Sequence, residues 1–356
     1  MAQKKKLLQS LFLYTGIIVV LLQQRVSIAR IAIVGSMLLW FGIVASAFAT
    51  NIQWLYFTYG FIHGGGRGAT MIAVNTVLLA YFDKYRGIAS GIRYAGATCS
   101  GLIFPKLVVF LEREYGFRGM LLIVGAMLIN ATAFISLLEE PPWFRQPQLK
   151  KDKAISKNEG DPGQSQGQSL PTLEGTEKEF QGPYSVLHII AVFRRPMFFI
   201  VALAGLSTVY TQSIFFSTIV DYAMDREMSL DAASSILVYT SLTDFLGAMG
   251  LPLLADRKLL RRSTLVMFCY VIVGLSAILY PIVTSVPLFV LVSLLLAMAA
   301  ATLMTMSTVI AADYLGVEKI PIFLATSGLV SVPLYFWNPR IVGKWWQLKH
   351  SYVRVY

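Results

Sequence analysis

The chain has 356 residues, of which 56% are apolar and only 14% are charged, and its mean hydropathy is +0.64. This composition excludes an ordinary soluble globular protein. The formal net charge of +11 is spread over several loops, and no basic tract interleaved with aromatic residues occurs, so the charge does not indicate nucleic-acid binding.

Ten segments are long and apolar enough to cross a hydrocarbon core about 30 Å thick. A spanning backbone must satisfy its own hydrogen bonds, and no segment alternates like a barrel strand, so all ten are expected to be helices. In chain order they are 8–24, 31–49, 53–80, 87–110, 117–138, 196–220, 232–255, 264–283, 286–312 and 320–338. The sequence therefore predicts an all-α, polytopic membrane protein.

The stretch between the fifth and sixth segments differs in composition from the rest of the chain. Residues 149–183 are rich in Lys, Glu, Gln, Ser, Gly and Pro, which predicts a disordered linker. The expected units are an N-terminal bundle of five helices (1–140), a cytoplasmic linker (141–192) and a C-terminal bundle of five helices (193–356). Two bundles are typical of transporters, and a single bundle with one long loop is the alternative.

Lys and Arg gather in every second connection, which predicts that these connections are cytoplasmic. The alternate connections are poorer in cations and are expected to face outside or into a lumen. The basic residues at both ends, at 4–6 and 344–354, fall on the opposite side and break this pattern. The connection after the third segment carries Lys84 and Arg86, and the one after the seventh carries Arg257, Lys258, Arg261 and Arg262.

One cytoplasmic connection carries a motif, YFDKYRGIASGIRYAG at residues 81–96. It resembles the Tyr-Phe-x-Lys-Arg-Arg-x-Leu-Ala-x-Gly signature of the monocarboxylate transporter family, a branch of the major facilitator superfamily. Tyr85 stands where the family has Arg, and Arg93 replaces a small apolar residue. Residues 104–128, 220–237, 252–262 and 312–321 are similar to other parts of the same family. The matching positions in the motif are Tyr81, Phe82, Lys84, Arg86, Ala89, Gly91 and Gly96.

The resemblance implies that the cytoplasmic loop motifs gate the passage between two bundles. In PLLADRKLLRR, residues 252–262, the carboxyl group of Asp256 at a helix end can cap that helix or pair with neighbouring cations and so latch adjacent helices. The alternative is that these charges only set the topology. The candidate gating residues are Tyr81, Phe82, Lys84, Arg86, Asp256 and Arg257.

Asp244 is the clearest charge inside a predicted span, and such a group usually faces a cavity or a partner because its burial costs several kcal/mol. It stands twelve residues before Asp256, about 18 Å from that helix end and close to the bilayer midplane. The resemblance implies an Asp here, followed one turn later by an Arg, for proton-coupled binding of a carboxylate. This chain has Ala248 at that turn, so Asp244 either carries a proton or has another cationic partner.

Three other ionisable residues are candidates for binding solute or protons. Arg67 stands fourteen residues before Tyr81, about 21 Å from the cytoplasmic end of its helix, and Arg93 lies two turns inside the next helix. His63 is one turn from Arg67 and titrates near neutrality. The alternatives are that Arg93 extends to the cytoplasmic surface, that His63 bonds a backbone carbonyl, and that Gly64–Gly66 serve helix packing.

Polar contacts with a solute are also expected from Tyr210 and Gln212, in a helix that lines the cavity in the superfamily. No Ser/His/Asp set, metal-ligand cluster, phosphate-binding glycine loop or paired carboxylates occur, so the chain is not expected to be an enzyme or to hold a cofactor or metal. Cys99 and Cys269 both fall inside predicted helices, so no disulfide is expected.

The expected function is a secondary active transporter of the monocarboxylate transporter type in the plasma membrane. It would move a small organic solute by alternating access, with proton symport and a single-span accessory glycoprotein as features that the resemblance implies. The ten segments correspond to the family's second through eleventh helices. The alternative is therefore a truncated, non-transporting paralogue that acts as a membrane interaction or regulatory protein.

Overall fold

The computed structural model describes residues 19, 22, 26–141, 194, 196–226, 228–280, 282–283, 285–328, 330–331, 333 and 337. Within this part of the chain all regular structure is helical. The helices are α2 (Ile28–Ala47), α3 (Ile52–Leu55), η1 (Tyr56–His63), α4 (Gly64–Tyr81), α5 (Arg86–Ser136), α8 (Pro196–Met224), α9 (Leu230–Asp256), α10 (Arg262–Leu279), α11 (Val286–Leu315) and η2 (Val317–Lys319). The fold is therefore all-helical, as the sequence predicted.

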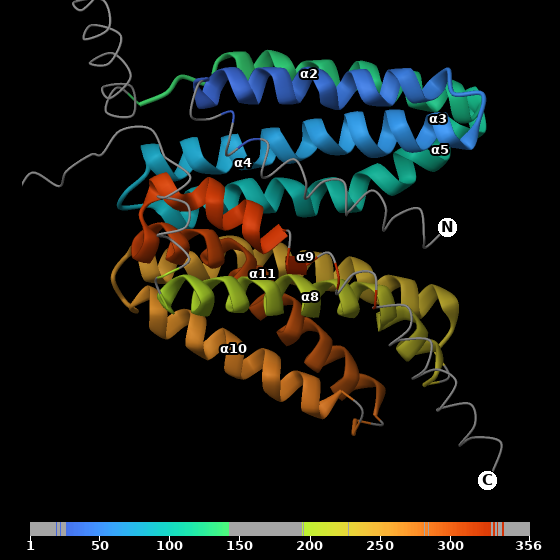
Figure 1. Cartoon of the computed structure of the whole chain (residues 1–356). Helices are drawn as coiled ribbons and strands as arrows, with labels where there is room; N and C mark the ends of the chain where they lie inside the picture. The colour runs from blue at the N-terminus through green and yellow to red at the C-terminus, as the bar shows by residue number, and fades with distance from the viewer. Residues whose placement is uncertain are drawn as a thin grey trace, which may run out of the picture.

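Six described helices are long and apolar enough to cross a membrane, namely α2, α5, α8, α9, α10 and α11. Two of the ten predicted segments, 87–110 and 117–138, are both part of α5. Gly116 interrupts α5 with φ 67° and ψ 172°, a kink that divides α5 into two helical parts. In Figure 1 these two parts of α5 run back along each other. The predicted segment 53–80 is divided among α3, the π-helix η1 and α4. Segment 8–24 and the linker 149–183 lie outside the described residues, as does part of 320–338.

The helices form two groups that lie against each other (Figure 1): α2, α3, η1, α4 and α5 in an N-terminal group, and α8, α9, α10 and α11 in a C-terminal group. Each group has its own apolar core. In the N-terminal group Ile43 packs with Leu111 and Leu121, and in the C-terminal group Ile219 packs with Phe289. Leu79 of α4 joins a further cluster whose other buried members are C-terminal side chains, so apolar burial also holds the two groups together.

Close packing inside the N-terminal group depends on glycine. A Cβ atom on Gly66 of α4 would lie 2.4 Å from the Leu39 nitrogen and 2.5 Å from the Gly35 oxygen, both in the backbone of α2. Backbone atoms cannot move aside as flexible side chains do. The glycine run at residues 64–66 therefore lets two membrane helices approach closely, which is the packing alternative weighed from the sequence.

We expect Gly66→Ala to lower the free energy of unfolding by about 1–3 kcal/mol, because the added methyl group forces α4 away from α2. Gly96→Ala is the matched control, since no atom lies within 4 Å of a Cβ there and alanine favours a helix. Thermal unfolding of both variants in the same detergent checks this expectation. Equal midpoints for the two variants would show that the α2–α4 contact is looser than described.

The two groups meet where α5 packs along α9. A Cβ on Gly91 would lie 2.4 Å from the carbonyl oxygen of Ala248, and a Cβ on Gly87 would lie 2.9 Å from the carboxylate of Asp256. We call this contact between α5 and α9 the seam. Small residues on α5 thus bring the N-terminal group close to the helix that carries both predicted acidic residues.

Candidate functional site

Two polar clusters lie along the seam. The central cluster consists of Tyr94 on α5, Gln212 on α8 and Asp244 on α9. The latch consists of Arg86 at the start of α5 together with Asp256, Arg262 and Asp313 of the C-terminal group. Each cluster joins the N-terminal group to the C-terminal group through polar side chains.

The central cluster surrounds a buried carboxyl group. Asp244 is 3% exposed, and the hydroxyl of Tyr94 lies close enough to its carboxyl group to interact with it. The amide nitrogen of Gln212, also buried, donates to the oxygen of the same Tyr94 hydroxyl. Asp244 Oδ1 makes no hydrogen bond within the described part of the chain. Burying a carboxyl oxygen without a hydrogen-bond donor costs about 1–3 kcal/mol of stability. This oxygen of Asp244 is therefore available to bind a proton or to accept a hydrogen bond from a solute.

The turn that follows Asp244 carries no cation. Ala248 is fully buried and its carbonyl oxygen faces Gly91 of α5 across the seam. Among the described residues no Lys or Arg forms an ion pair with Asp244. A neutral group, the Tyr94 hydroxyl, therefore lies near the carboxyl group where the family resemblance implies a guanidinium group.

Arg93 and Tyr210 lie on the helices of the central cluster but outside its hydrogen bonds. Arg93 precedes Tyr94 on α5, and its Nε atom is buried with no hydrogen-bond partner among the described residues. Tyr210 lies on α8, two residues before Gln212, and is partly buried. The structure thus adds a cationic donor beside the cluster, although that donor does not pair with Asp244.

His63 and Arg67 belong to the N-terminal group and make no described contact with Asp244. The Nδ1 atom of His63 lies 2.8 Å from the carbonyl oxygen of Leu39, and its ring stacks on Tyr59 with 5.1 Å between the ring centroids. Arg67 is exposed on α4, close enough to His63 to interact electrostatically. The hydrogen bond from His63 to a backbone carbonyl corresponds to the packing alternative weighed from the sequence.

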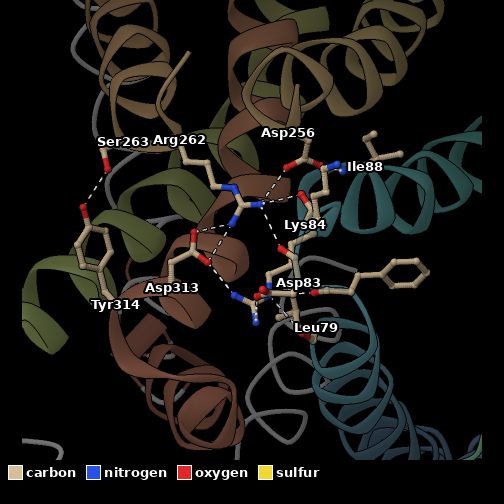
Figure 2. Close-up of polar contacts among 11 residues, drawn as sticks. Leu79, Asp83, Lys84, Ile88, Asp256, Arg262, Ser263, Asp313 and Tyr314 are labelled. Carbon is tan, nitrogen blue, oxygen red and sulfur yellow. Dashed lines mark hydrogen bonds and ion pairs between the residues drawn. The ribbon is translucent and has the colours of Figure 1, made fainter. Parts of the chain in front are cut away.

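The latch is a chain of charges that alternate in sign. Arg262 at the start of α10 binds Asp313 of α11 at 2.8 and 3.0 Å and Asp256 at 3.1 Å (Figure 2). Arg86 of the N-terminal group binds the same Asp313 at 2.9 Å. The second oxygen of Asp256 accepts the backbone N–H of Ile88, in the first turn of α5, at 2.8 Å. Asp256 and Asp313 each connect the C-terminal group to α5.

The latch differs from an ordinary surface ion pair because one of its carboxylates is fully buried. The side chain of Asp256 is fully buried at the end of α9, where the helix dipole disfavours a negative charge. It therefore depends on Arg262 and on the N–H of Ile88 for compensation. Asp83, which also pairs with Arg86, is 92% exposed, so that pair contributes about 0–1 kcal/mol.

The structure brings two of the predicted gating side chains, Arg86 and Asp256, into one network. Three further predicted residues lie beside it: the carbonyl oxygen of Lys84 accepts from Arg262 at 3.2 Å, that of Phe82 accepts from Arg86 at 2.9 Å, and the Tyr81 hydroxyl donates to the Glu139 carbonyl at 2.9 Å. The side chain of Arg257 is exposed and, within the described residues, forms no ion pair.

Sequence reasoning missed three residues that the structure places in these clusters. Arg262 was counted only as a loop cation, and Tyr94 was not singled out within its motif. Asp313 carried a usable signal, because it is the only acidic residue in the sequence of α11 and lies one turn or less from the helix end. A single acid at the end of an apolar helix, expected on the same side as the basic loops, indicates an ion pair.

Residues 8–332 match the sequence profile of the family described as Major Facilitator Superfamily. The chain belongs to the major facilitator superfamily. It is therefore an integral membrane protein of a family of transporters and not of enzymes, as the sequence predicted.

Curated relatives of this superfamily member include monocarboxylate transporters. The chain is 26% identical to monocarboxylate transporter 12 of Xenopus laevis over 324 residues, which are 87% of this chain and 66% of the relative. It is 24% identical to human monocarboxylate transporter 2 over 335 residues, which are 92% of this chain and 67% of the relative. The chain thus spans about two thirds of the length of these relatives. The resemblance seen in the motifs is confirmed as distant homology.

A solved structure agrees with this assignment at the level of the fold. A variant of the E. coli fucose:proton symporter superimposes with a TM-score of 0.64 at 16% sequence identity, covering 96% of this chain and 85% of that structure. The all-helical fold of this superfamily member is therefore shared with a known transporter.

Proposed function

We propose that this superfamily member is a symporter of the monocarboxylate transporter type. In this proposal a small organic solute and a proton bind beside the central cluster, and the N-terminal and C-terminal groups rock about the seam to expose the cluster to each side in turn. The proposal keeps two expectations that the sequence motifs suggested, the plasma membrane as its location and a single-span accessory glycoprotein as a candidate partner.

The position of Asp244 is the observation that supports this proposal. A buried carboxyl group within an apolar helix is costly and marks a proton or solute pathway more often than a structural contact. Asp244 and Gln212 belong to the C-terminal group, whereas Tyr94 belongs to the N-terminal group. Movement of one group against the other would therefore separate the Tyr94 hydroxyl from the Asp244 carboxyl group and change the environment of its proton.

Arg93, which precedes Tyr94 on α5, favours a solute that carries a carboxylate. The buried Nε–H of Arg93 has no acceptor among the described residues, and a carboxylate is the acceptor that suits a guanidinium group best. In this arrangement Arg93 holds the negative charge of the solute while Asp244 holds the proton. The missing Arg at position 248 is thus replaced in function by Arg93, on the opposite side of the seam.

Uptake by the purified chain in proteoliposomes tests this proposal. With an inward proton gradient we expect accumulation of small monocarboxylates, but not of amines of similar size. Arg93→Gln is expected to lower this uptake about tenfold or more, because it removes a charge-assisted hydrogen bond. The matched control is Arg113→Gln, an exposed cation farther along α5. If no solute accumulates above the level in empty liposomes, the alternative of a non-transporting membrane protein is favoured.

A further inference from the structure

A surface pocket of about 470 Å³ opens next to the latch, between the two groups of helices. Lys84 and Tyr85 contribute from the N-terminal group, and the turn after α9 contributes Arg257 and Lys258. The proposed transport cycle uses none of these side chains. The pocket nevertheless gathers three cationic groups at the place where the two groups of helices meet.

The three cations of the pocket are not neutralised by the protein. Within the described residues no carboxylate forms an ion pair with Lys84, Arg257 or Lys258. The ammonium group of Lys84 lies 5.2 Å from the ring centroid of Tyr85, a contact that leaves its positive charge in place. The one acid in the lining, Asp256, already binds the latch through both carboxylate oxygens.

The backbone around the pocket adds to its positive potential. Neither α5 nor α10, which both begin beside the latch, has an acidic residue in its first turn or an N-cap residue whose own side chain caps the helix. At the start of α5 the partial positive charge is partly offset by the contact between Ile88 and Asp256. Lys258 has a φ of 62°, the left-handed conformation that commonly ends a helix, and the N–H of the next residue, Leu259, bonds the carbonyl oxygen of Leu254 at 3.1 Å. The turn after α9 therefore has a defined shape where it lines the pocket.

We propose that this pocket binds a phosphate-bearing anion, which bridges Lys84 of the N-terminal group and Arg257 and Lys258 of the C-terminal group. The anion contacts both groups of helices only while the latch is closed, so its binding stabilises the closed state. The phosphate belongs either to a soluble phosphate ester or to the headgroup of an anionic lipid, since the basic loops place the pocket on the side expected to face the cytoplasmic leaflet. This site is distinct from the central cluster and does not depend on the identity of the transported solute.

The test measures the thermal unfolding midpoint of the full chain in detergent, because a ligand that binds only the folded state raises this midpoint with concentration. One arm adds glycerol 3-phosphate, and the other adds phosphatidic acid to the micelles, with phosphatidylcholine as the reference lipid. The double variant Arg257→Gln, Lys258→Gln removes two exposed side chains of the pocket. The matched control is Lys106→Gln, Arg113→Gln, which removes two exposed cations from α5 beyond the seam.

We expect phosphatidic acid, glycerol 3-phosphate or both to raise the midpoint of the wild-type chain and of the control variant. The pocket variant should need about tenfold more ligand for the same rise, which corresponds to the loss of about one charge-assisted hydrogen bond. A rise with phosphatidic acid alone identifies a lipid as the source of the phosphate, and a rise with both probes identifies phosphate esters in general. The proposal is overturned if neither probe raises the midpoint, or if the pocket variant responds as the wild-type chain does. Either result leaves the proposed transport function untouched.

Discussion

Asp244→Asn is expected to lower proton-driven solute uptake at least about tenfold, which corresponds to about 1.4 kcal/mol of lost coupling. Asparagine has nearly the same size and keeps an oxygen that can accept from Tyr94, so the fold is expected to survive the change. The amide group of asparagine cannot bind and release a proton near neutral pH, as a carboxyl group can. The variant should therefore retain exchange of solute across the membrane while losing accumulation that depends on a pH gradient.

Uptake and exchange measured side by side in proteoliposomes check this expectation. Asp231→Asn is the matched control, because it makes the same chemical change in the first turn of the same helix, at an exposed position. Its uptake should stay within about twofold of the wild-type chain, as expected for a surface substitution. If Asp244→Asn accumulates solute with the same dependence on the proton gradient as the wild-type chain, Asp244 is not the proton-coupling group.

Asp313→Asn is expected to open the latch. Asp313 is the only acid shared by Arg86 and Arg262 among the described residues, so its loss leaves two partly buried cations facing each other. Each 1.4 kcal/mol of lost latch stability shifts the balance between closed and open states about tenfold. The change should therefore increase the population in which the two groups of helices are separated at this end.

Spin labels at Tyr85 and Leu259, on opposite walls of the surface pocket, report this separation in a chain whose cysteines Cys99 and Cys269 are replaced by serine. Asp313→Asn should shift the distribution of distances between the two labels toward longer distances. Asp83→Asn is the matched control, because Asp83 also pairs with Arg86 but is 92% exposed, and such pairs contribute little. Equal distributions for the two variants would show that the latch does not hold the groups together.

The sequence predicted those features that follow from local composition. Long apolar segments predict spanning helices because an unsatisfied backbone is too costly in lipid, and Asp244 was identified because a charge at that depth is expensive. Arg86 and Asp256 were identified from the resemblance of their loops to a family motif. Each of these predictions needs only a few neighbouring residues of the sequence, or the free-energy cost of placing a polar group inside a long apolar segment.

The partners of these residues could not be predicted, because they depend on how distant helices pack. Arg86 and Asp313 are 227 positions apart, and Gln212 reaches Tyr94 across 118 positions. The close approach of α5 to α9, on which both clusters depend, requires Gly91 against the backbone of Ala248. A glycine in an apolar helix can have several structural roles, and only the three-dimensional packing shows which role it has.

The central claim is that the Asp244 cluster borders a passage that opens to each side of the membrane in turn. The most direct test places a single cysteine at position 94, by Tyr94→Cys in the chain whose two native cysteines are replaced by serine, and applies a membrane-impermeant thiol reagent from either side. With the latch intact we predict labelling from the side opposite the latch, and with Asp313→Asn additional labelling from the latch side. Absence of labelling from both sides, in both chains, would show that the cluster is sealed in dry helix packing and would contradict the account.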